Sequence, residues 1–396
     1  MDNRNNRPSN RNTNGRTPQN NRTSRNVPSG RTTPVRQRQT GTTSNATTIV
    51  AVLIVIAVFV NYNIFSKIIT KNVPAVDYSK YEKVSSQDSK EDSEQQKLKE
   101  RLADIETNYT DVNASVSDTK CGELLLVNKI HKYDFDARSS LVPYEAPESI
   151  YDSKSECYYV KNINLSLNKS AISALNSLLE GFAEATGHTD IIIVDAHRTY
   201  EMQQIVLDAK IDQYGEEQGR LIATEPGASE HHSGYAIDLS LFIDGRQEDY
   251  YGEGVYEWIT KNCYKYGFVI RYPEDKTAIT GIDYEPWHLR YVGIPHAYHM
   301  TRENLCLEEY IDRLAYYPIE SDRLTIAAPD GTYEVYSAPV ADGTGTIKVP
   351  KTLPYTLSGD NNGHVVVTVK INDTPNPDLV QQFYEAQAAQ RDTVTE

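Results

Sequence analysis

The chain has 396 residues and a formal net charge of −15, a length that allows two ordinary domains with extensions. The charge is uneven, because residues 1–48 contain nine Arg, no Lys and one Asp, which leaves −23 for the rest of the chain. The strong negative charge of the chain after residue 48 argues against nucleic acid as a partner.

The first 46 residues are rich in Asn, Thr, Arg, Pro and Ser and contain almost no large apolar side chain. Such a segment cannot bury enough apolar surface to offset the entropy of ordering its backbone. We therefore predict that residues 1–46 are a disordered basic segment.

A strongly apolar stretch follows at residues 47–66. At about 1.5 Å per residue, a helix of this length spans the roughly 30 Å hydrocarbon core of a membrane. The nine Arg come before the stretch and only Lys67 and Lys71 follow it closely, so the positive-inside rule places the N-terminus in the cytoplasm. A cleaved signal peptide is disfavoured because the basic region is too long and no small-x-small site follows. We predict a single-pass cell-membrane protein, anchored through residues 47–66, with everything after the anchor extracellular.

Residues 67–116 are highly charged, and Leu98, Leu102 and Ile105 fall at helical spacing within them. A short amphipathic helix is expected here. The segment is either a stalk that lifts the body off the membrane or a plain solvated linker, and the pattern does not separate the two.

Residues 117–315 look like the main domain. Apolar side chains at helical spacing predict a helix that begins near Ser170 and ends at Gly187, and Ile191–Val194 reads as a buried strand. A second helix is expected from about Tyr200. Period-two alternation over Tyr235–Leu241 predicts a strand with Asp238 on the face opposite the apolar one.

Further along, Gly254–Phe268 is interpreted as a helix and Trp287–Val292 as a strand. Helices and strands mix without regular βαβ alternation, so we predict an α+β fold with helices around a small antiparallel sheet. Residues 316–375 contain alternating β-formers and turn signals, which predict a small all-β module. A polar tail at 376–396 follows.

Four cysteines lie in the predicted outer part, and none forms a C-x-x-C pair. A cysteine zinc site is therefore improbable. Disulfides and free thiols both remain open from the sequence.

Two separated stretches carry candidate chemistry. In the first, His231 or His232 lies shortly before Asp238; in the second, Glu285 precedes His288 by three residues. A strand Asp is costly to bury unless a metal, a cation or several donors satisfy it. Two imidazoles and one carboxylate would leave the open fourth position of a catalytic zinc site, and a second carboxylate would serve as general base. The alternative is that these are surface histidines in ordinary ion pairs.

The pattern S-x-H-x-x-G-x-A-x-D, carried here by residues 229–238, and the downstream E-x-W-H, carried by residues 285–288, resemble the VanY-type zinc D-alanyl-D-alanine carboxypeptidases, relatives of the D-Ala-D-Ala dipeptidases. Flanking stretches at 126–129, 266–273 and 288–293 are similar as well. The likeness covers roughly residues 120–312.

The resemblance implies one zinc ion per chain, held by His231, Asp238 and His288, and it implies Glu285 as the catalytic base. It also favours His231 over His232.

A third family element appears at residues 197–203 with Arg198 and Gln203 retained, while His197 and Thr199 replace the usual aromatic residue and Ser. The implied substrate-binding residues are Arg198, Gln203 and Ser229. An Arg at the end of a strand can hold a terminal carboxylate in a bidentate way, although a structural pair with Asp195 is an equal alternative from the residues alone.

The expected function is hydrolysis of the terminal D-Ala from peptidoglycan stem peptides that end in D-Ala-D-Ala. A peptidoglycan endopeptidase and a non-catalytic wall-binding scaffold are the alternatives.

Overall fold

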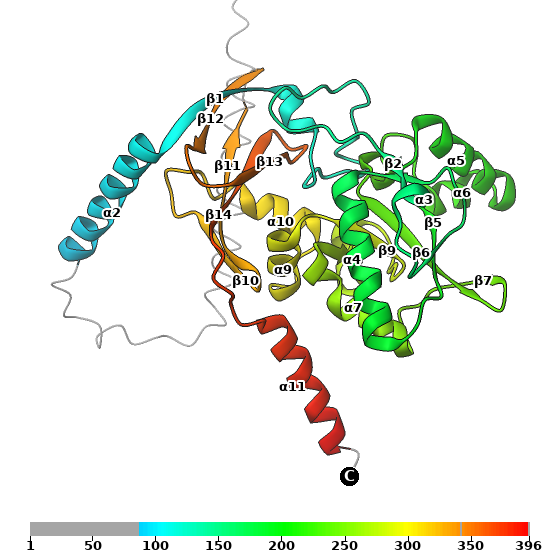
Figure 1. The fold of residues 1–396 in the computed structure, drawn as a ribbon. Coiled ribbons are helices and arrows are strands. Elements are labelled where there is room, and N and C mark those ends of the chain that lie inside the picture. The colour runs from blue at the N-terminus through cyan, green and yellow to red at the C-terminus, as the bar shows by residue number, and fades with distance from the viewer. Residues whose placement is uncertain (1–86, 341–342, 395–396) are drawn as a thin grey trace, which may run out of the picture. The chain divides into compact units, whose positions relative to one another are not determined.

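The computed structural model describes residues 87–340 and 343–394, in which helices surround a central sheet and a second group of strands lies toward the C-terminus (Figure 1). The predicted disordered segment and the predicted membrane span at 47–66 lie outside the described residues. Among the residues described, no helix is both long and apolar enough to cross a bilayer.

The central sheet has six strands in the order β3-β5-β6-β9-β8, with β7 paired to β6. All pairs are antiparallel except β3 with β5, so the expected antiparallel sheet is confirmed apart from this edge. The strands are β3 (Tyr159–Val160), β5 (Ile191–Asp195), β6 (Ala236–Ile243), β7 (Arg246–Glu248), β8 (Phe268–Ile270) and β9 (His288–Tyr291). A separate short pair joins β2 (Glu148–Ser149) to β4 (Ser166–Leu167).

Helix α4 (Lys169–Thr186) covers the apolar face of this sheet. Its buried stripe packs in one core with the alternate apolar residues of β6, as their spacing predicts. Its N-cap is Asn168, so Ser170 lies in the first turn, where its backbone N–H and hydroxyl donate to Glu145. Gly187 ends the helix in the left-handed conformation, with φ of 76°.

The remaining helices of this region are shorter. They are α3 (Ile150–Ser153), α5 (Tyr200–Tyr214), α6 (Glu216–Ile222), α7 (Glu257–Asn262), α8 (Thr277–Thr280), α9 (Ile294–Arg302) and α10 (Leu307–Leu314). The prediction of one helix over Gly254–Phe268 is wrong. Only α7 is α-helical there, between the 3₁₀ turns η4 (Gly254–Tyr256) and η5 (Cys263–Tyr266). Gly267, with φ of +85°, ends η5 in the left-handed conformation and turns the chain into β8.

The C-terminal strands form an antiparallel sheet in the order β10-β11-β14-β13. Its strands are β10 (Leu324–Ala328), β11 (Gly331–Pro339), β13 (Tyr355–Gly359) and β14 (His364–Asn372). The remaining strand, β12 (Thr344–Pro350), pairs with β1 (Tyr109–Ser115), so the end of the predicted stalk contributes a strand beside the C-terminal module.

Helix α2 (Gln87–Asn108) precedes β1 and confirms the helix expected from the spacing. Of the three apolar side chains at helical spacing, Ile105 is buried, whereas Leu98 and Leu102 remain exposed.

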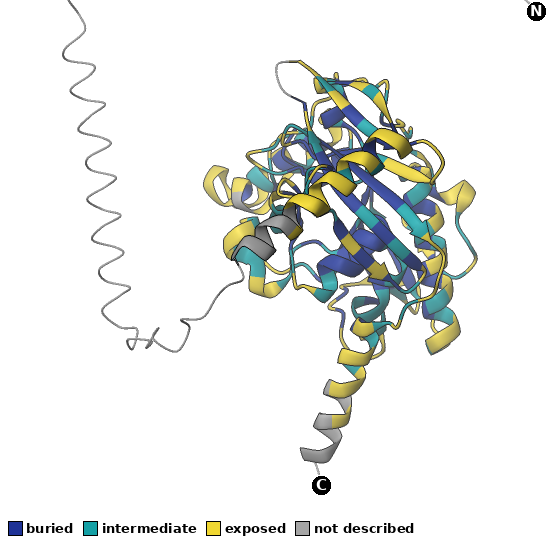
Figure 2. Cartoon of the chain, turned by 90° about the vertical axis from the view of Figure 1, so that its left-hand side faces the viewer, coloured by how far each residue is buried: buried dark blue, intermediate teal, exposed yellow. Residues whose placement is uncertain are grey.

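Both faces of the C-terminal sheet are buried. One face packs with α9 and α10, and the other packs with β1, β12 and Ile105. Figure 2 shows the buried residues gathered along these strands, whereas most of the described side chains of α11 (Leu379–Val394) are exposed. All four cysteines are free thiols.

Candidate metal centre and substrate pocket

Three of the predicted site residues converge at one end of the central sheet. Asp238 on β6 pairs in register with His288 on β9, and His231 lies in the 3₁₀ turn η3 (Glu230–Ser233) that leads into β6. One possible ligand atom from each residue lies within 4.8 Å of the others. Strand pairing therefore joins two stretches that are some fifty residues apart in sequence.

The hydrogen bonds of the two imidazole rings show which nitrogen of each ring faces the other possible metal ligands. His231 Nδ1 lies 2.6 Å from the Ala196 carbonyl, which leaves Nε2 toward Asp238 Oδ2 at 3.5 Å. His288 Nε2 lies 3.1 Å from Glu230 Oε2, which leaves Nδ1 toward Asp238 Oδ1 at 2.8 Å. Ligand atoms on a tetrahedral zinc, with bonds of about 2.1 Å, lie about 3.4 Å apart. The donor set and its spacing fit that ion, and an outward hydrogen bond from each ring is the usual support of a ligating His.

His232 has no ring nitrogen left for a metal. Its Nδ1 donates to the Arg198 carbonyl at 2.7 Å, and its Nε2 accepts from the Gly227 N–H at 3.0 Å. Burial lowers the pKa of this ring to about 4, so it is neutral at pH 7. The geometry therefore favours His231 over His232 as the metal ligand, a choice that the residues alone left open.

Glu230 is a site residue that the sequence reasoning missed. Its side chain is fully buried, with one oxygen toward His288 and the other accepting from Arg271 Nε and Arg290 Nη1, each at 2.6 Å. Burial opposes its ionisation, but the two guanidinium groups hold its pKa well below the usual range. Glu230 therefore orients His288 as a carboxylate. Its position beside His231 was the available signal, together with the Arg residues in the two flanks that resemble the family.

Glu285 lies at the open side of the three donors. Its Oε2 is 3.9 Å from His288 Nδ1, and its side chain is 30% exposed. Burial raises the pKa of this carboxyl, and the neighbouring His288 offsets part of that effect. Asp238 differs from Glu285. Burial alone would raise its pKa, but His231 and His288 lower the pKa by more, so Asp238 stays ionised.

Arg198 lies beside Asp238, with Nη2 3.8 Å from Asp238 Oδ2. Its Nε and Nη2 donate to Asp195 Oδ2 at 3.0 and 2.8 Å, so the structural pair considered above is present. Its Nη1 donates to Gln203 Oε1 at 2.7 Å, and Gln203 Nε2 in turn donates to the Thr224 carbonyl at 2.7 Å. Both ends of the Gln203 amide are therefore engaged in holding Arg198 and the neighbouring backbone.

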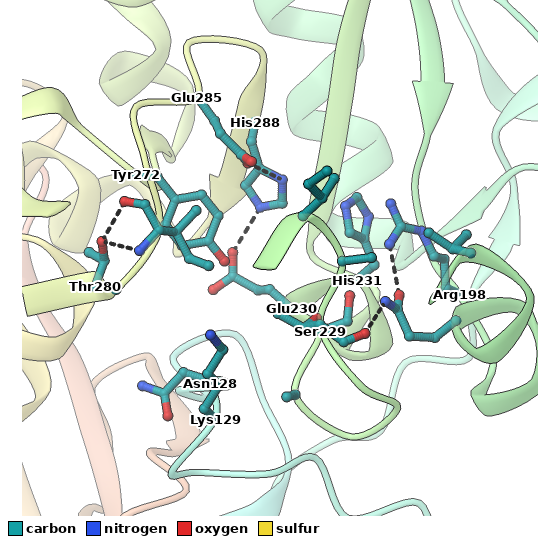
Figure 3. A pocket seen from close by; sticks show the side chains of 18 of the residues that line it. Asn128, Lys129, Arg198, Ser229, Glu230, His231, Tyr272, Thr280, Glu285 and His288 are labelled. Atoms are coloured by element: carbon teal, nitrogen blue, oxygen red, sulfur yellow. Dashed lines mark hydrogen bonds and ion pairs between the residues drawn. The ribbon is translucent and has the colours of Figure 1, made fainter. Parts of the chain in front are cut away.

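A cavity of about 640 Å³ opens over these residues. Ser229, Arg198 and Gln203 line it together with the three donors and Glu285. Figure 3 shows His288 and Glu285 on one side, Arg198 and His231 on another, and Asn128 and Lys129 on a further side. Aliphatic side chains complete the lining: Ile130, Val206, Ile222, Ile279 and Ile282. The cavity combines a charged end with apolar walls, as peptide-binding sites do.

Comparison with known proteins agrees with this geometry. Residues 164–294 match the VanY family, described as D-alanyl-D-alanine carboxypeptidase. A D-alanyl-D-alanine carboxypeptidase of Enterococcus faecium is 31% identical over 277 residues, which cover 69% of this chain and 84% of that protein.

Two solved structures extend the comparison. The vancomycin resistance D,D-dipeptidase VanXYg in complex with a D-Ala-D-Ala phosphinate analogue is 30% identical, with a TM-score of 0.56, and the match covers 66% of this chain and 99% of that one. A mutant of the D,D-pentapeptidase VanY in complex with Zn(II) is 32% identical, with a TM-score of 0.37, and the match covers 48% of this chain and 98% of that one.

Proposed function

Because the chain belongs to the VanY family of D-alanyl-D-alanine carboxypeptidases and is a metallopeptidase by that membership, we propose that it is a zinc enzyme which removes the terminal D-alanine from peptidoglycan stem peptides. The observation that carries the proposal is the convergence of His231, Asp238 and His288 beside Glu285 in one cavity. Within the described residues there is one such group of donors, which suits one zinc ion per chain.

His231 Nε2, His288 Nδ1 and one Asp238 oxygen would hold the metal, since these atoms face one another while the outer nitrogens of both rings are engaged. Zinc held there would supply Lewis-acid chemistry for a water nucleophile and for the scissile carbonyl.

Glu285 is proposed to move the proton. As a carboxylate beside the open side of the donors, it takes a proton from the attacking water and delivers it to the departing D-alanine amine. Its raised pKa favours this exchange, because a base whose pKa lies nearer the working pH both accepts and returns a proton readily.

Arg198 is proposed to bind the free C-terminal carboxylate of the substrate. Asp195 and Gln203 fix its guanidinium beside the donors, so the side chain is ordered before substrate arrives. Ser229 lines the same cavity and is proposed to contact the substrate as well. Gln203 acts through Arg198.

The location of the enzyme is proposed from the sequence. Residues 47–66 would anchor it in the cell membrane with the N-terminus in the cytoplasm, so that residues after the anchor face outward. Stem peptides of nascent wall lie on that side, which supports the assigned substrate.

Metal analysis combined with D-alanine release tests the proposal. The purified full-length chain should contain close to one zinc per chain and release D-alanine from a pentapeptide that ends in D-Ala-D-Ala. A chelator should abolish the release, and added zinc should restore it. Mass analysis of products from a cross-linked dimer separates this activity from an endopeptidase. A protein that binds zinc but releases no D-alanine would instead support a wall-binding scaffold.

A further inference from the structure

One turn of the C-terminal β module is hydrogen bonded to a chain segment that lines the substrate cavity. The segment between β13 and β14 contacts residues 119–132, the stretch that supplies Asn128, Lys129 and Ile130 to the cavity lining. We call residues 126–132 the wall segment. Its backbone is hydrogen bonded to this turn at several points, beginning with the Leu126 N–H, which donates to the Asp360 carbonyl at 3.2 Å.

Asn361 is the centre of this contact. Its Nδ2 donates to the Leu126 carbonyl at 2.8 Å and to the Lys132 carbonyl at 3.1 Å, so one amide group joins the two ends of the wall segment. Its Oδ1 accepts from Lys120 Nζ at 2.7 Å, and its backbone N–H donates to the Thr119 carbonyl at 2.8 Å. Asn361 is 4% exposed and adopts φ of 60°, a conformation that Asn tolerates better than most residues.

The wall segment is also joined to the metal centre. Asn128 Oδ1 accepts from the N–H groups of Ile130 and His131, which folds the turn that carries Lys129. Asn128 Nδ2 donates to Glu308 at 3.2 Å. Glu308 pairs with Arg271, and Arg271 contacts Glu230. The wall segment is thus held between the β module and the residues that orient His288.

Lys129 is the charge that the wall segment presents to the cavity. Its side chain is exposed and lines the cavity. Its charge helps to lower the pKa of Glu225, but the ion pair of that carboxylate is with Lys132. Figure 3 places Asn128 and Lys129 on a different side of the cavity from Arg198. If the terminal carboxylate lies at Arg198 and the scissile bond at the donors, the residues upstream of the scissile bond extend toward other parts of the cavity rim.

On the basis of the proposed function, we infer that Lys129 binds a carboxylate of the substrate upstream of the scissile bond, and that Asn361 is a positioning residue that holds Lys129 in place. The β module, in which the sequence shows no chemistry, then acts in substrate selection. A carboxylate is the chemical class that the ammonium of an exposed Lys at a cavity rim attracts as a point charge.

The test measures binding separately from turnover. Two pentapeptides that end in D-Ala-D-Ala are compared, one with a free carboxylate upstream and one with that carboxylate amidated. Their Kd values are measured by calorimetry on the zinc-loaded full-length chain carrying Glu285→Gln, which prevents cleavage. The ratio of the two Kd values reports recognition of the carboxylate.

We expect the free acid to bind up to about fivefold more tightly than the amide, as an exposed ion pair allows. Lys129→Ala should bring the ratio close to one. Asn361→Gly, which keeps the positive φ but removes the side chain, should do the same while zinc content is retained. In the Lys129→Ala background, Asn361→Gly should change the ratio no further, because the two residues act through one contact.

Asn376→Ala is the matched control. Asn376 also joins backbone carbonyls with its Nδ2, but at Ala328 and Gly331, on a different turn of the same module. This variant should keep the ratio of the unmutated chain. If Asn361→Gly and Asn376→Ala change the ratio equally, the effect of Asn361 is one of general stability, and its positioning role is overturned.

A ratio of one before mutation, or a ratio unchanged by Lys129→Ala, would overturn the assignment of Lys129. The parallel assay of D-alanine release by the chain with Glu285 intact reports on the proposed function alone. Selective binding without release would remove the carboxypeptidase proposal and leave the inference on recognition standing.

Discussion

At the scale of single residues, the site separates two carboxylates by their surroundings. Glu230 is fully buried, but two guanidinium groups keep its pKa low, so it remains an anion that fixes His288. Within the described part of the chain no cation lies within hydrogen-bonding distance of Glu285, since His288 Nδ1 is 3.9 Å away, and burial raises the pKa of this carboxyl. Opposite pKa shifts in neighbouring acids distinguish a fixed anion from a proton carrier. The two residues should therefore fail in different ways when they are changed.

Replacing Glu285 should stop catalysis without loss of metal. Glu285→Ala removes the proton carrier but none of the three donors, so D-alanine release should fall by about 10²–10⁴-fold. Zinc content should equal that of the unmutated chain. Product analysis and metal analysis on the same preparation check both outcomes, and near-normal turnover by this variant would exclude Glu285 as the base.

Replacing Glu230 should weaken the metal centre instead. Glu230→Gln removes the anion behind His288, and loss of such a partner typically lowers metal affinity by about 10–100-fold. It also leaves Arg271 and Arg290 short of a buried counter-charge, which costs about 3–5 kcal/mol of stability. Zinc titration and thermal unfolding measure the two effects. Unchanged zinc affinity would show that His288 does not depend on this hydrogen bond.

Arg198 should matter for peptides with a free C-terminus. A charge-assisted contact to a carboxylate contributes about 1.5–3 kcal/mol, so Arg198→Ala should lower kcat/KM for the acid by about 10–150-fold. The same peptide with a C-terminal amide serves as the reference, because it lacks the carboxylate in either enzyme. If the acid-to-amide preference survives in the variant, the role of this side chain is limited to its structural contacts with Asp195 and Gln203.

At the scale of elements, one buried acid joins the two chain segments that flank the wall segment. Asp118 Oδ2 accepts from the N–H and hydroxyl of Ser115 at 2.6 and 2.8 Å. Its Oδ1 accepts from the Ser139 hydroxyl and from the N–H groups of Ser140 and Leu141. Asp118 thereby joins the end of β1 to a loop more than twenty residues later. Burial disfavours its charged form, but these donors lower its pKa from 3.8 to about 2.

The lowered pKa makes the stability from Asp118 depend on pH. A carboxyl whose folded-state pKa is depressed contributes stability above its unfolded pKa, here about 3.8, and this contribution is lost as pH falls toward 2. Asp118→Asn should therefore lower the free energy of unfolding by about 2 kcal/mol at pH 7. The difference from the unmutated chain should shrink between pH 4 and pH 2. Denaturant titrations across this range measure it, with Asp134→Asn on the exposed surface as control, and a constant difference would contradict the assignment.

At the scale of the whole molecule, local patterns predicted the elements better than their long-range pairing. Period-two alternation placed Asp238 opposite the apolar face of its strand, and the structure pairs that residue with His288. Glu230 was missed because a Glu in a turn looks like ordinary surface until Arg271 and Arg290 are brought to it from distant segments. The pairing of β1 with β12 was missed for the same reason, since it joins residues more than two hundred positions apart.

The main domain and the C-terminal β module share one hydrophobic core. The face of β14 that carries Val366 lies in one cluster with Tyr298 and Tyr310 of helices α9 and α10. The Ser337 N–H and hydroxyl donate to the Tyr317 and Leu314 carbonyls, and Thr368 contacts buried His296 at 3.0 Å. A chain that ends at Tyr317 would expose this face of the helices to water.

Each large side chain so exposed forfeits about 1.5–3 kcal/mol, and a domain's whole stability is about 5–15 kcal/mol. Uncovering several of them should therefore exceed what the remaining fold can tolerate. We expect the truncated chain to be insoluble or to lack a cooperative unfolding transition, and the full-length chain to unfold residues 109–372 in one step. Calorimetry on both proteins checks this. A soluble truncated chain that unfolds cooperatively and releases D-alanine would show that the β module contributes neither to folding nor to the site.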